Sequence, residues 1–152
     1  MTAAAVMEQD WLAARLGRIT ASKDFLDILR GNGSILLAQK LREIQQDYHD
    51  NTGEATAAMM HGNRMESMAQ EAILRHMPDG SKAAGKEVIV HPDLPYVSAS
   101  PDMINRRRHL IGEIKCPTKD STWHKAAKEI DIGQLRKDWQ VQVQAQLWVC
   151  RA

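Results

Sequence analysis

The sequence of 152 residues has no long apolar run, only two cysteines and almost no net charge. No stretch approaches the roughly 20 apolar residues that a transmembrane helix requires, and the first residues lack the cationic lead and apolar block of a secretory signal. Cys116 and Cys150 have neither the number nor the spacing of a disulfide framework or a metal motif, so we interpret them as reduced thiols. These absences predict a cytoplasmic protein with no membrane partner.

The bulk composition is that of an ordinary globular protein. Hydrophobic residues make up 43% and charged residues 26% of the chain, which is typical of soluble folded domains. A chain of this length buries roughly 70% of its unfolded surface around one core. Because no internal repeat or low-complexity linker divides it, residues 1–152 are predicted to form a single domain.

Charge is distributed unevenly along the chain. The formal net charge of +1 does not by itself indicate a nucleic-acid partner. Residues 101–152 contain ten Lys and Arg against six Asp and Glu, a net charge of +4, whereas residues 1–100 contain ten against thirteen, a net charge of −3. The later part, together with Arg15 and Arg18, can therefore form a face that contacts phosphate, and an ordinary solvated surface is the alternative.

Hydrophobic periodicity and turn residues predict the secondary structure. Helices are expected at 8–15, 23–29, 35–49, 55–76 and 118–129, the last anchored by Trp123, and strands at 86–91, 96–100 and 110–116. Thr20 or Ser22 is expected to cap the second helix. Residues 138–150 alternate Val and Gln, which favours a strand, although Val141, Ala145 and Trp148 also fit a helical stripe.

The helix at 35–49 is predicted to be amphipathic. Its buried side is expected to carry five apolar residues: Ile35, Leu36, Leu37, Leu41 and Ile44. Its other side is expected to be solvated and carries four charged residues: Lys40, Arg42, Glu43 and Asp47.

The segment around Asp102 brings acidic and basic side chains together. After a basic turn, the run Leu110–Cys116 alternates as a strand does, so Glu113 and Lys115 share one face. A carboxylate and an ammonium on a buried strand are costly unless something occupies the space between them and Asp102. A divalent metal ion would do so, because hard cations prefer carboxylate oxygen ligands.

The pattern Pro101-Asp102, a spacer and Glu113-x-Lys115 resembles the signature of the PD-(D/E)xK nuclease superfamily. With its flanking residues it is similar to the core of the phage lambda exonuclease family, the YqaJ-like viral recombinases. Further blocks occur in the order expected for that family: Trp11-x-x-x-Arg15-x-Gly-x-Ile-Thr-Ala-Ser22, Gly62-x-x-x-Glu66 and Gln142-Val-Gln-x-x-x-Trp148. The resemblance runs from Trp11 to Arg151. Met103 stands where the family usually has Gly, which bears on the conformation of the turn there.

The resemblance implies an α/β (α+β) fold with a restriction-endonuclease-like core, in which a central mixed β-sheet is flanked by helices. It also implies a helix, not a strand, for residues 138–150. Family members continue past this helix with at least one further strand and terminal helices. We therefore expect the chain to lack that C-terminal strand and those helices.

The resemblance also implies a site for Mg²⁺, with Mn²⁺ as a substitute. The metal ligands would be Asp102, Glu113, Glu66 and the Ile114 carbonyl. Lys115 would orient the attacking water or stabilise charge on the phosphate, and together with the three carboxylates it makes up the implied catalytic set.

Glu66 has a second interpretation that rests on spacing alone. It shares one face of the helix at 55–76 with Gly62, Ala69 and Ile73, so it sits in an apolar stripe. A buried carboxylate needs a partner, and a structural pairing with an arginine such as Arg75 or Arg64 is the alternative to an active-site role.

A second implied site binds the 5′-phosphate of a DNA end through Arg15, Ser22, Ser100 and Gln142. Spacing alone leaves Arg15 and Ser22 as a surface arginine and a helix cap. An arginine fork beside a helix N-terminus with a hydroxyl is, however, also suited to binding an anion.

In function, the resemblance implies a Mg²⁺-dependent 5′-to-3′ exonuclease of phage recombination that digests one strand of duplex DNA and releases mononucleotides. Family members are homotrimers that work with a phage single-strand annealing protein, so a phage- or prophage-encoded protein of the bacterial cytoplasm is expected. Three alternatives stay open: a non-catalytic DNA-end-binding module, a structure-specific endonuclease, and a hydrolase of small phosphorylated molecules.

Overall fold

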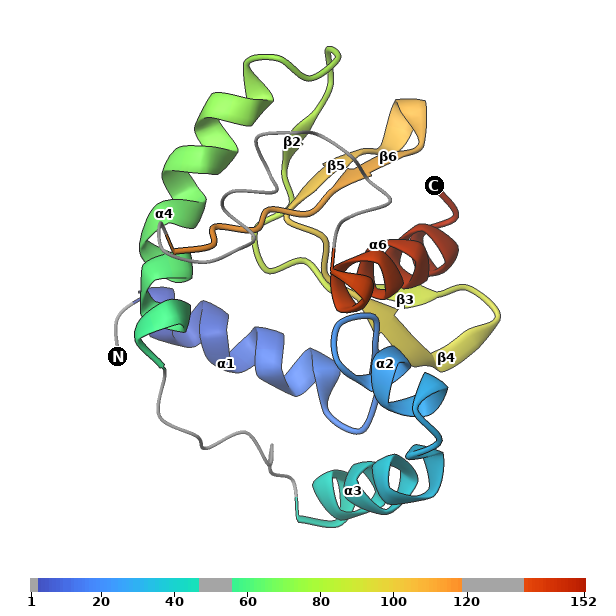
Figure 1. Ribbon diagram of the computed structural model, residues 1–152. Helices are drawn as coiled ribbons and strands as arrows, with labels where there is room; N and C mark the ends of the chain where they lie inside the picture. The colour runs from blue at the N-terminus through green and yellow to red at the C-terminus, as the bar shows by residue number, and fades with distance from the viewer. Residues whose placement is uncertain (1–2, 47–55, 119–135) are drawn as a thin grey trace.

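The computed structural model describes residues 3–46, 56–118 and 136–152 (Figure 1). The helices are α1 (Ala3–Arg15), α2 (Asp24–Leu29), α3 (Gly33–Gln46), α4 (Ala57–Leu74), the 3-10 helix η1 (Arg106–Arg108) and α6 (Lys137–Cys150). The strands are β1 (Ile19–Thr20), β2 (Lys82–Ala83), β3 (Ile89–His91), β4 (Leu94–Ala99), β5 (Met103–Asn105) and β6 (Leu110–Gly112). The expected α+β class is confirmed. None of the helices in these ranges is long and apolar enough to span a bilayer.

The strands form two three-stranded sheets where one central sheet was expected. In the first, β4 lies between β1, which is parallel to it, and β3, which is antiparallel. In the second, β5 lies between β2 and β6 and is antiparallel to both. β4 and β5 are consecutive and are separated by 100–102, where Pro101 has no N–H with which to continue a ladder. The break between the sheets thus lies directly before Asp102.

α6 covers the first sheet and supplies part of its core. Val97 and Ala99 of β4 cluster with Ala145 and Val149 of α6, all of them buried. Ala145 and Val149 are one helical turn apart, so they face the sheet together. The helix that the family resemblance implies is therefore confirmed, and the strand favoured by Val/Gln alternation is wrong.

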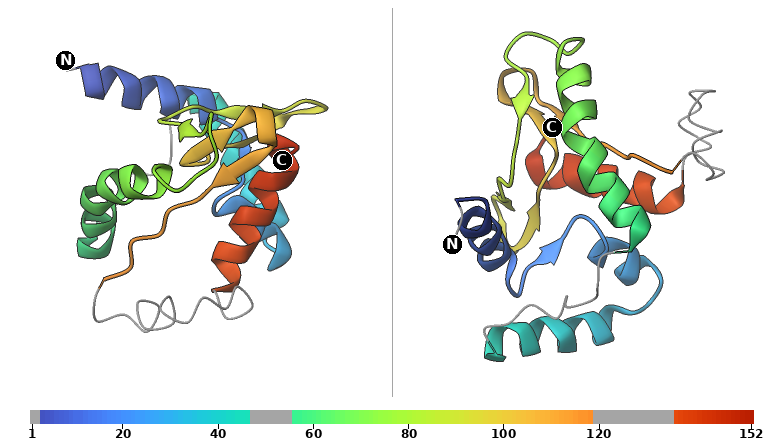
Figure 2. Two further views of the ribbon diagram at one scale, coloured as in Figure 1. Left: turned by 90° about the horizontal axis from the view of Figure 1, so that it is seen from above. Right: turned by 90° about the vertical axis from the view of Figure 1, so that its left-hand side faces the viewer.

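The segment after β6 runs between α4 and α6, as Figures 1 and 2 both show. The predicted strand 110–116 ends at Gly112, and residues 113–118 have no regular secondary structure. The backbone N–H of Ile114 donates to Oδ2 of Asp102 at 2.5 Å instead of to a neighbouring strand. The Asp102 carboxylate thus accepts the hydrogen bond that a neighbouring strand would otherwise accept from Ile114.

Several element boundaries differ from those expected. Thr20 does not cap α2 but belongs to β1, opposite Ser98, and no side chain caps the N-terminus of α2. The strand expected at 86–91 is reduced to β3, and the two-residue strands β1 and β2 were not expected. The predicted helix 118–129, with Trp123, lies almost wholly outside the described residues.

α3 buries a different face from the one expected. Of the five apolar residues predicted on its buried side, only Leu36 is buried. The other four are 52% to 68% exposed: Ile35, Leu37, Leu41 and Ile44. Lys40 and Glu43, expected to be solvated, are only 7% and 3% exposed.

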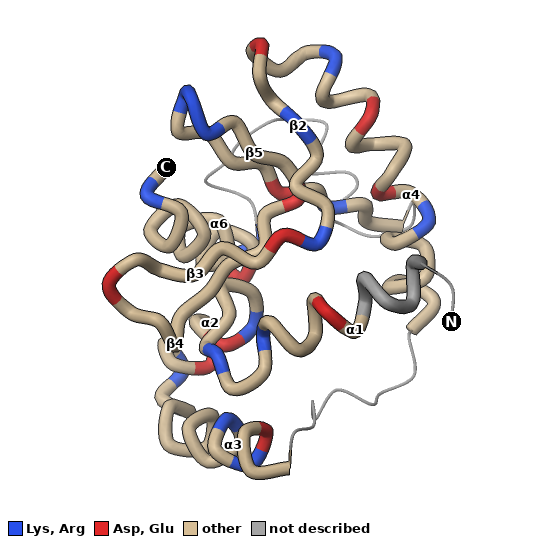
Figure 3. The backbone as a smooth tube through the Cα atoms, turned by 180° about the vertical axis from the view of Figure 1, so that it is seen from behind, with Lys and Arg blue, Asp and Glu red and all other residues tan. Residues whose placement is uncertain are grey.

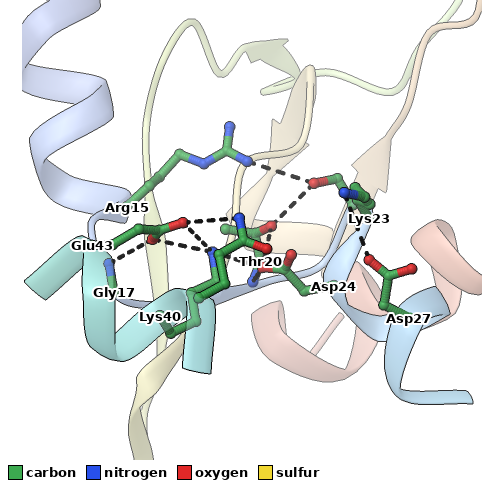
Figure 4. A network of polar contacts seen from close by, with 10 residues as sticks. Arg15, Gly17, Thr20, Lys23, Asp24, Asp27, Lys40 and Glu43 are labelled. Carbon is green, nitrogen blue, oxygen red and sulfur yellow. Dashed lines mark hydrogen bonds and ion pairs between the residues drawn. The ribbon is translucent and has the colours of Figure 1, made fainter. Parts of the chain in front are cut away.

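A network of charged side chains explains this burial (Figure 4). Lys40 Nζ lies 3.2 Å from Oδ2 of Asp24 on α2 and 3.3 Å from Oε2 of Glu43 on its own helix. The same Glu43 oxygen accepts a hydrogen bond from the backbone N–H of Gly17, in the turn after α1, at 3.2 Å. One ammonium thus lies against two buried carboxylates, and the network links α3 to α2 and to the turn after α1.

Replacing Lys40 by Met should lower the free energy of unfolding by about 3–5 kcal/mol, because Asp24 and Glu43 would stay buried without their counter-ion. Urea denaturation measures this change. The matched control is Arg75→Met, which breaks the exposed Arg75–Glu71 pair on α4 and should cost less than about 1 kcal/mol. Equal and small losses of unfolding free energy in the two variants would contradict the claim that Lys40 compensates the buried charges of Asp24 and Glu43.

Candidate active site

Asp102 is held by backbone contacts from three directions. Its N–H donates to the Gly112 carbonyl at 3.0 Å, and its carbonyl accepts from Ala84 N–H at 2.9 Å and from Nε2 of Gln70 on α4 at 2.7 Å. Its neighbour Met103 lies buried in β5 with an ordinary negative φ, so the position needs no glycine. The departure from the family pattern at Met103 therefore leaves the carboxylate in place.

Glu113 is held by three donors. Gln142 Nε2 and Lys115 Nζ both donate to its Oε1 at 2.6 Å, and Gln146 Nε2 donates to its Oε2 at 2.7 Å. Its side chain is 8% exposed, whereas that of Lys115 is 32% exposed. Glu113 and Lys115 therefore lie on one side of the chain, although this segment is not a strand.

Glu66 faces the same region from α4. Together with Gly62 it lines a cavity of about 390 Å³ whose other wall includes Ile114, Lys115 and Cys116. Of the two arginines that spacing allowed as partners, Arg75 pairs with Glu71 instead, and no ion pair joins Arg64 to Glu66 among the described residues. The structure thus brings Glu66 to the side of Asp102 and Glu113 and not into an apolar core.

Burial and two neighbouring carboxylates act on Asp102. Burial, then the negative charge of Glu113 and, more weakly, that of Glu66, raise the pKa of Asp102 to about 6, against the lowering effect of the Ile114 N–H. Burial, with the charges of Glu66 and Asp102, also raises the pKa of the Cys116 thiol. A divalent cation is the ligand that relieves such repulsion.

The carboxylate oxygens at this site suit a hard cation as ligands, both by atom type and by charge. In the part of the chain that the structure describes, no three Asp, Glu, His or Cys side chains are gathered closely enough to hold a metal ion. A carboxylate has about four acceptor positions, and the protein's own donors use three of those on Glu113. The residues present therefore fit Mg²⁺ chemically while internal hydrogen bonds hold Glu113 in place.

A second cavity, of about 100 Å³, brings together all four residues predicted to bind phosphate: Arg15, Ser22, Ser100 and Gln142. The Arg15 guanidinium lies 3.5 Å from the Ser22 hydroxyl and 4.1 Å from the centre of the Trp11 ring. Trp11 Nε1 donates to the Ser100 hydroxyl at 3.3 Å. Guanidinium, hydroxyl and amide groups on one wall make an anion site chemically reasonable.

The buried charge network of α3 reaches the pocket through Thr20, and Figure 4 shows Arg15 and Thr20 next to that network. Asp24 Oδ2 accepts from Thr20 N–H at 2.8 Å and from Thr20 Oγ1 at 3.0 Å. Thr20 Oγ1 in turn lies 3.1 Å from the Ser22 hydroxyl. Burial lowers the pKa of Arg15, and the charges of Asp24 and Glu43 oppose that effect. The network therefore supports both Arg15 and Ser22.

Basic residues gather at the far end of the β5–β6 hairpin, as Figure 3 shows. The arginines of η1 form its turn and are exposed, and Arg106 pairs with Glu87. Asp102 and Glu113 lie beyond the opposite end, where Met103 pairs with Gly112. The basic turn is thus separated from the carboxylates by the length of the hairpin.

Comparison with known proteins identifies the family. The model of the YqaJ-like viral recombinase domain matches residues 10–152. The chain belongs to this family. No curated protein matches the sequence.

Two solved structures are similar to this YqaJ-like domain. An alkaline exonuclease (LHK-Exo) from Laribacter hongkongensis is 28% identical, with a TM-score of 0.65, over 93% of this chain and 68% of that one. LHK-Exo in complex with dAMP is 25% identical, with a TM-score of 0.67, over 94% and 68%. Family and neighbours together support a nuclease role.

Two residues at the site of this YqaJ-like domain were not singled out by sequence reasoning. Trp11 belongs to the first motif but not to the predicted phosphate site, yet its ring contacts Arg15 and its N–H reaches Ser100. Gln146 donates to Glu113 and was overlooked because the Val/Gln alternation draws attention to period two. Gln146 lies four residues after Gln142, so in a helix both side chains lie on the same face, and this spacing could have indicated Gln146.

Asp102→Asn should remove a pH dependence of stability. The folded protein binds the Asp102 proton more tightly than the unfolded chain, because its pKa is about 6 against an ordinary value of 3.8. Its contribution to stability is therefore present below about pH 4 and lost as the pH rises through 6. Without divalent cations, the variant should be more stable than wild type at pH 8, on the order of 1 kcal/mol.

Denaturation curves between pH 4 and pH 8 measure this difference, which should shrink toward pH 4. Asp10→Asn, at an exposed position on α1, controls for the loss of one negative charge. A pH-independent difference between wild type and Asp102→Asn would refute the raised pKa of Asp102.

Proposed function

We propose that the protein is a Mg²⁺-dependent deoxyribonuclease that digests one strand of double-stranded DNA from its 5′ end. The observation that carries this proposal is that Glu113, which lies on the same side as Asp102 and Glu66, also lies next to the cavity that Arg15 lines. Gln142 lines the pocket and also donates to Glu113 at 2.6 Å. A phosphate bound in the pocket would thus lie close to the carboxylates.

Asp102, Glu113, Glu66 and the Ile114 carbonyl would hold the cation, with Mn²⁺ as a substitute for Mg²⁺. When bound, a divalent ion lowers the pKa of a coordinated water and neutralises charge on the phosphate. Lys115 would add a compact ammonium: its Nζ is already 2.6 Å from Glu113, and the side chain lines the cavity that Glu66 faces. From there it would orient the attacking water or stabilise charge on the scissile phosphate.

The pocket around Arg15 would set the polarity of digestion. A terminal phosphate carries more negative charge and more free oxygens than an internal phosphodiester, so the Arg15 and Ser22 donors favour it. Anchoring that end beside Glu113 places the first phosphodiester near the carboxylates and makes a mononucleotide the product. LHK-Exo was crystallised with dAMP, which is a mononucleotide.

The proposed partners follow from the family. They are double-stranded DNA ends, a phage single-strand annealing protein and further copies of the chain in a homotrimer. A phage- or prophage-encoded protein acting in the cytoplasm of a bacterial host would meet all three.

A structure-specific endonuclease of the same superfamily and a non-catalytic DNA-end-binding module are the competing functions. A duplex with a different label at each end separates them. Progressive release of nucleotides from the 5′-labelled ends with Mg²⁺ supports the proposal. Internal cuts support the endonuclease, and binding without cleavage supports the module.

Lys115→Ala should reduce cleavage by a factor of at least about 100, because the ammonium acts on charge that develops in the transition state. Binding of Mn²⁺, followed by calorimetry, should remain. Lys82→Ala, at an exposed position on β2, is the matched control and should retain activity. Cleavage by Lys115→Ala at the wild-type rate would remove Lys115 from the mechanism.

Arg15→Ala should abolish the preference for a 5′-phosphate. In wild type the rate on a 5′-phosphorylated duplex should exceed the rate on a 5′-hydroxyl duplex, and in the variant the two rates should approach each other. Arg30→Ala, exposed at the end of α2, should keep the wild-type ratio. A ratio near one in wild type itself would refute the pocket.

A further inference from the structure

Gln146 is a buried amide that is only half satisfied. It is 1% exposed, and its Nε2 donates to Oε2 of Glu113 at 2.7 Å. Its Oε1 has no hydrogen-bond partner, and it is the one buried side-chain polar atom without a partner in the part of the chain that the structure describes. An unpaired buried acceptor lowers folding stability, so its retention calls for a reason.

The chemistry of Glu113 fixes the orientation of this amide. An ionised carboxylate can only accept hydrogen bonds, and the groups that point at Glu113 are donors. Turning the Gln146 amide over would place its oxygen against a carboxylate oxygen, which is repulsive. The NH₂ group must therefore face Glu113, and the unpaired oxygen is a consequence of that contact.

Gln142 and Gln146 hold the two oxygens of Glu113 separately. They are one turn apart on α6, so they project from the same face of the helix. Because one amide binds Oε1 and the other Oε2, the pair fixes the rotation of the carboxylate and not only its position. The same face of α6 carries Ala145 and Val149, which anchor the helix to the first sheet.

We propose that Gln146 is a positioning residue, which orients the Glu113 carboxylate for a divalent cation at the expense of folding stability. The inference rests on the proposed function and adds to it a residue with no part in the family motif. Hydrogen-bond partners of metal ligands fix the orientation of those ligands, and their loss typically costs about 10- to 100-fold in metal affinity or activity.

Gln146→Leu tests this proposal because it separates positioning from structure. Leucine has a similar volume and removes both the Nε2 donor and the unpaired oxygen. The variant should unfold at the same urea concentration as wild type, or at a higher one. Its Mn²⁺ affinity, measured by calorimetry on the full chain without DNA, should fall by about 10- to 100-fold.

A merely structural role for Gln146 predicts the reverse pattern. Stability would then fall, while the Mn²⁺ affinity of the folded fraction would stay at the wild-type value. Gln144→Leu, exposed on the same helix, is the matched control and should alter neither quantity. Gln146→Met, which keeps an unbranched side chain, replaces the leucine variant if the latter does not fold.

A double-mutant cycle identifies the residue through which Gln146 acts. In a Glu113→Gln background, Gln146→Leu should cause no further loss of Mn²⁺ affinity, because the carboxylate it orients is gone. A full additional loss in that background would overturn the proposal. Equal affinities for wild type and Gln146→Leu would overturn it while leaving the nuclease function intact, and no Mn²⁺ binding by wild type would overturn both.

Discussion

The structure depends on the contact between α6 and the Glu113 carboxylate. The segment after β6 leaves the sheet at Gly112, so no strand ladder holds Glu113. Two glutamine amides and the Lys115 ammonium take that place. The face of α6 that packs on the first sheet is also the face that holds Glu113. The same face of α6 therefore packs the core and orients the carboxylate. A displaced α6 would disturb both.

A second constraint acts from the opposite side of the pocket. Lys40 brings two carboxylates, Asp24 and Glu43, into the interior, and through Thr20 and Gly17 they fix the segment that carries Arg15 and Ser22. Buried ion pairs of this kind contribute little net stability compared with apolar packing. Their effect here is geometric, since a mobile Arg15 would present no defined donor fork to a phosphate.

Sequence reasoning predicted which candidate site residues lie close together better than it predicted the buried faces of the helices around them. Asp102, Glu113 and Lys115 were recognisable because the residues of a chemical motif lie close together in the sequence. The buried face of α3 was not, because Lys40 and Glu43 are stable inside only through Asp24, which lies on another helix, and periodicity carries no such information. For α6, the Val/Gln alternation favoured a strand, although a helical stripe also fitted. Only the resemblance to a family selected the helix, and with it Gln142; Gln146 was not among the predicted site residues.

The central proposal is that carboxylates on α4 and on both sides of the β5–β6 hairpin would form one site for a divalent cation. Anomalous diffraction from crystals soaked in Mn²⁺ tests it most directly. The account predicts a peak within about 2.5 Å of carboxylate oxygens of both Asp102 and Glu113, on the side that Glu66 faces. A saturating soak that gives no peak there, or a peak only at other residues, would contradict it.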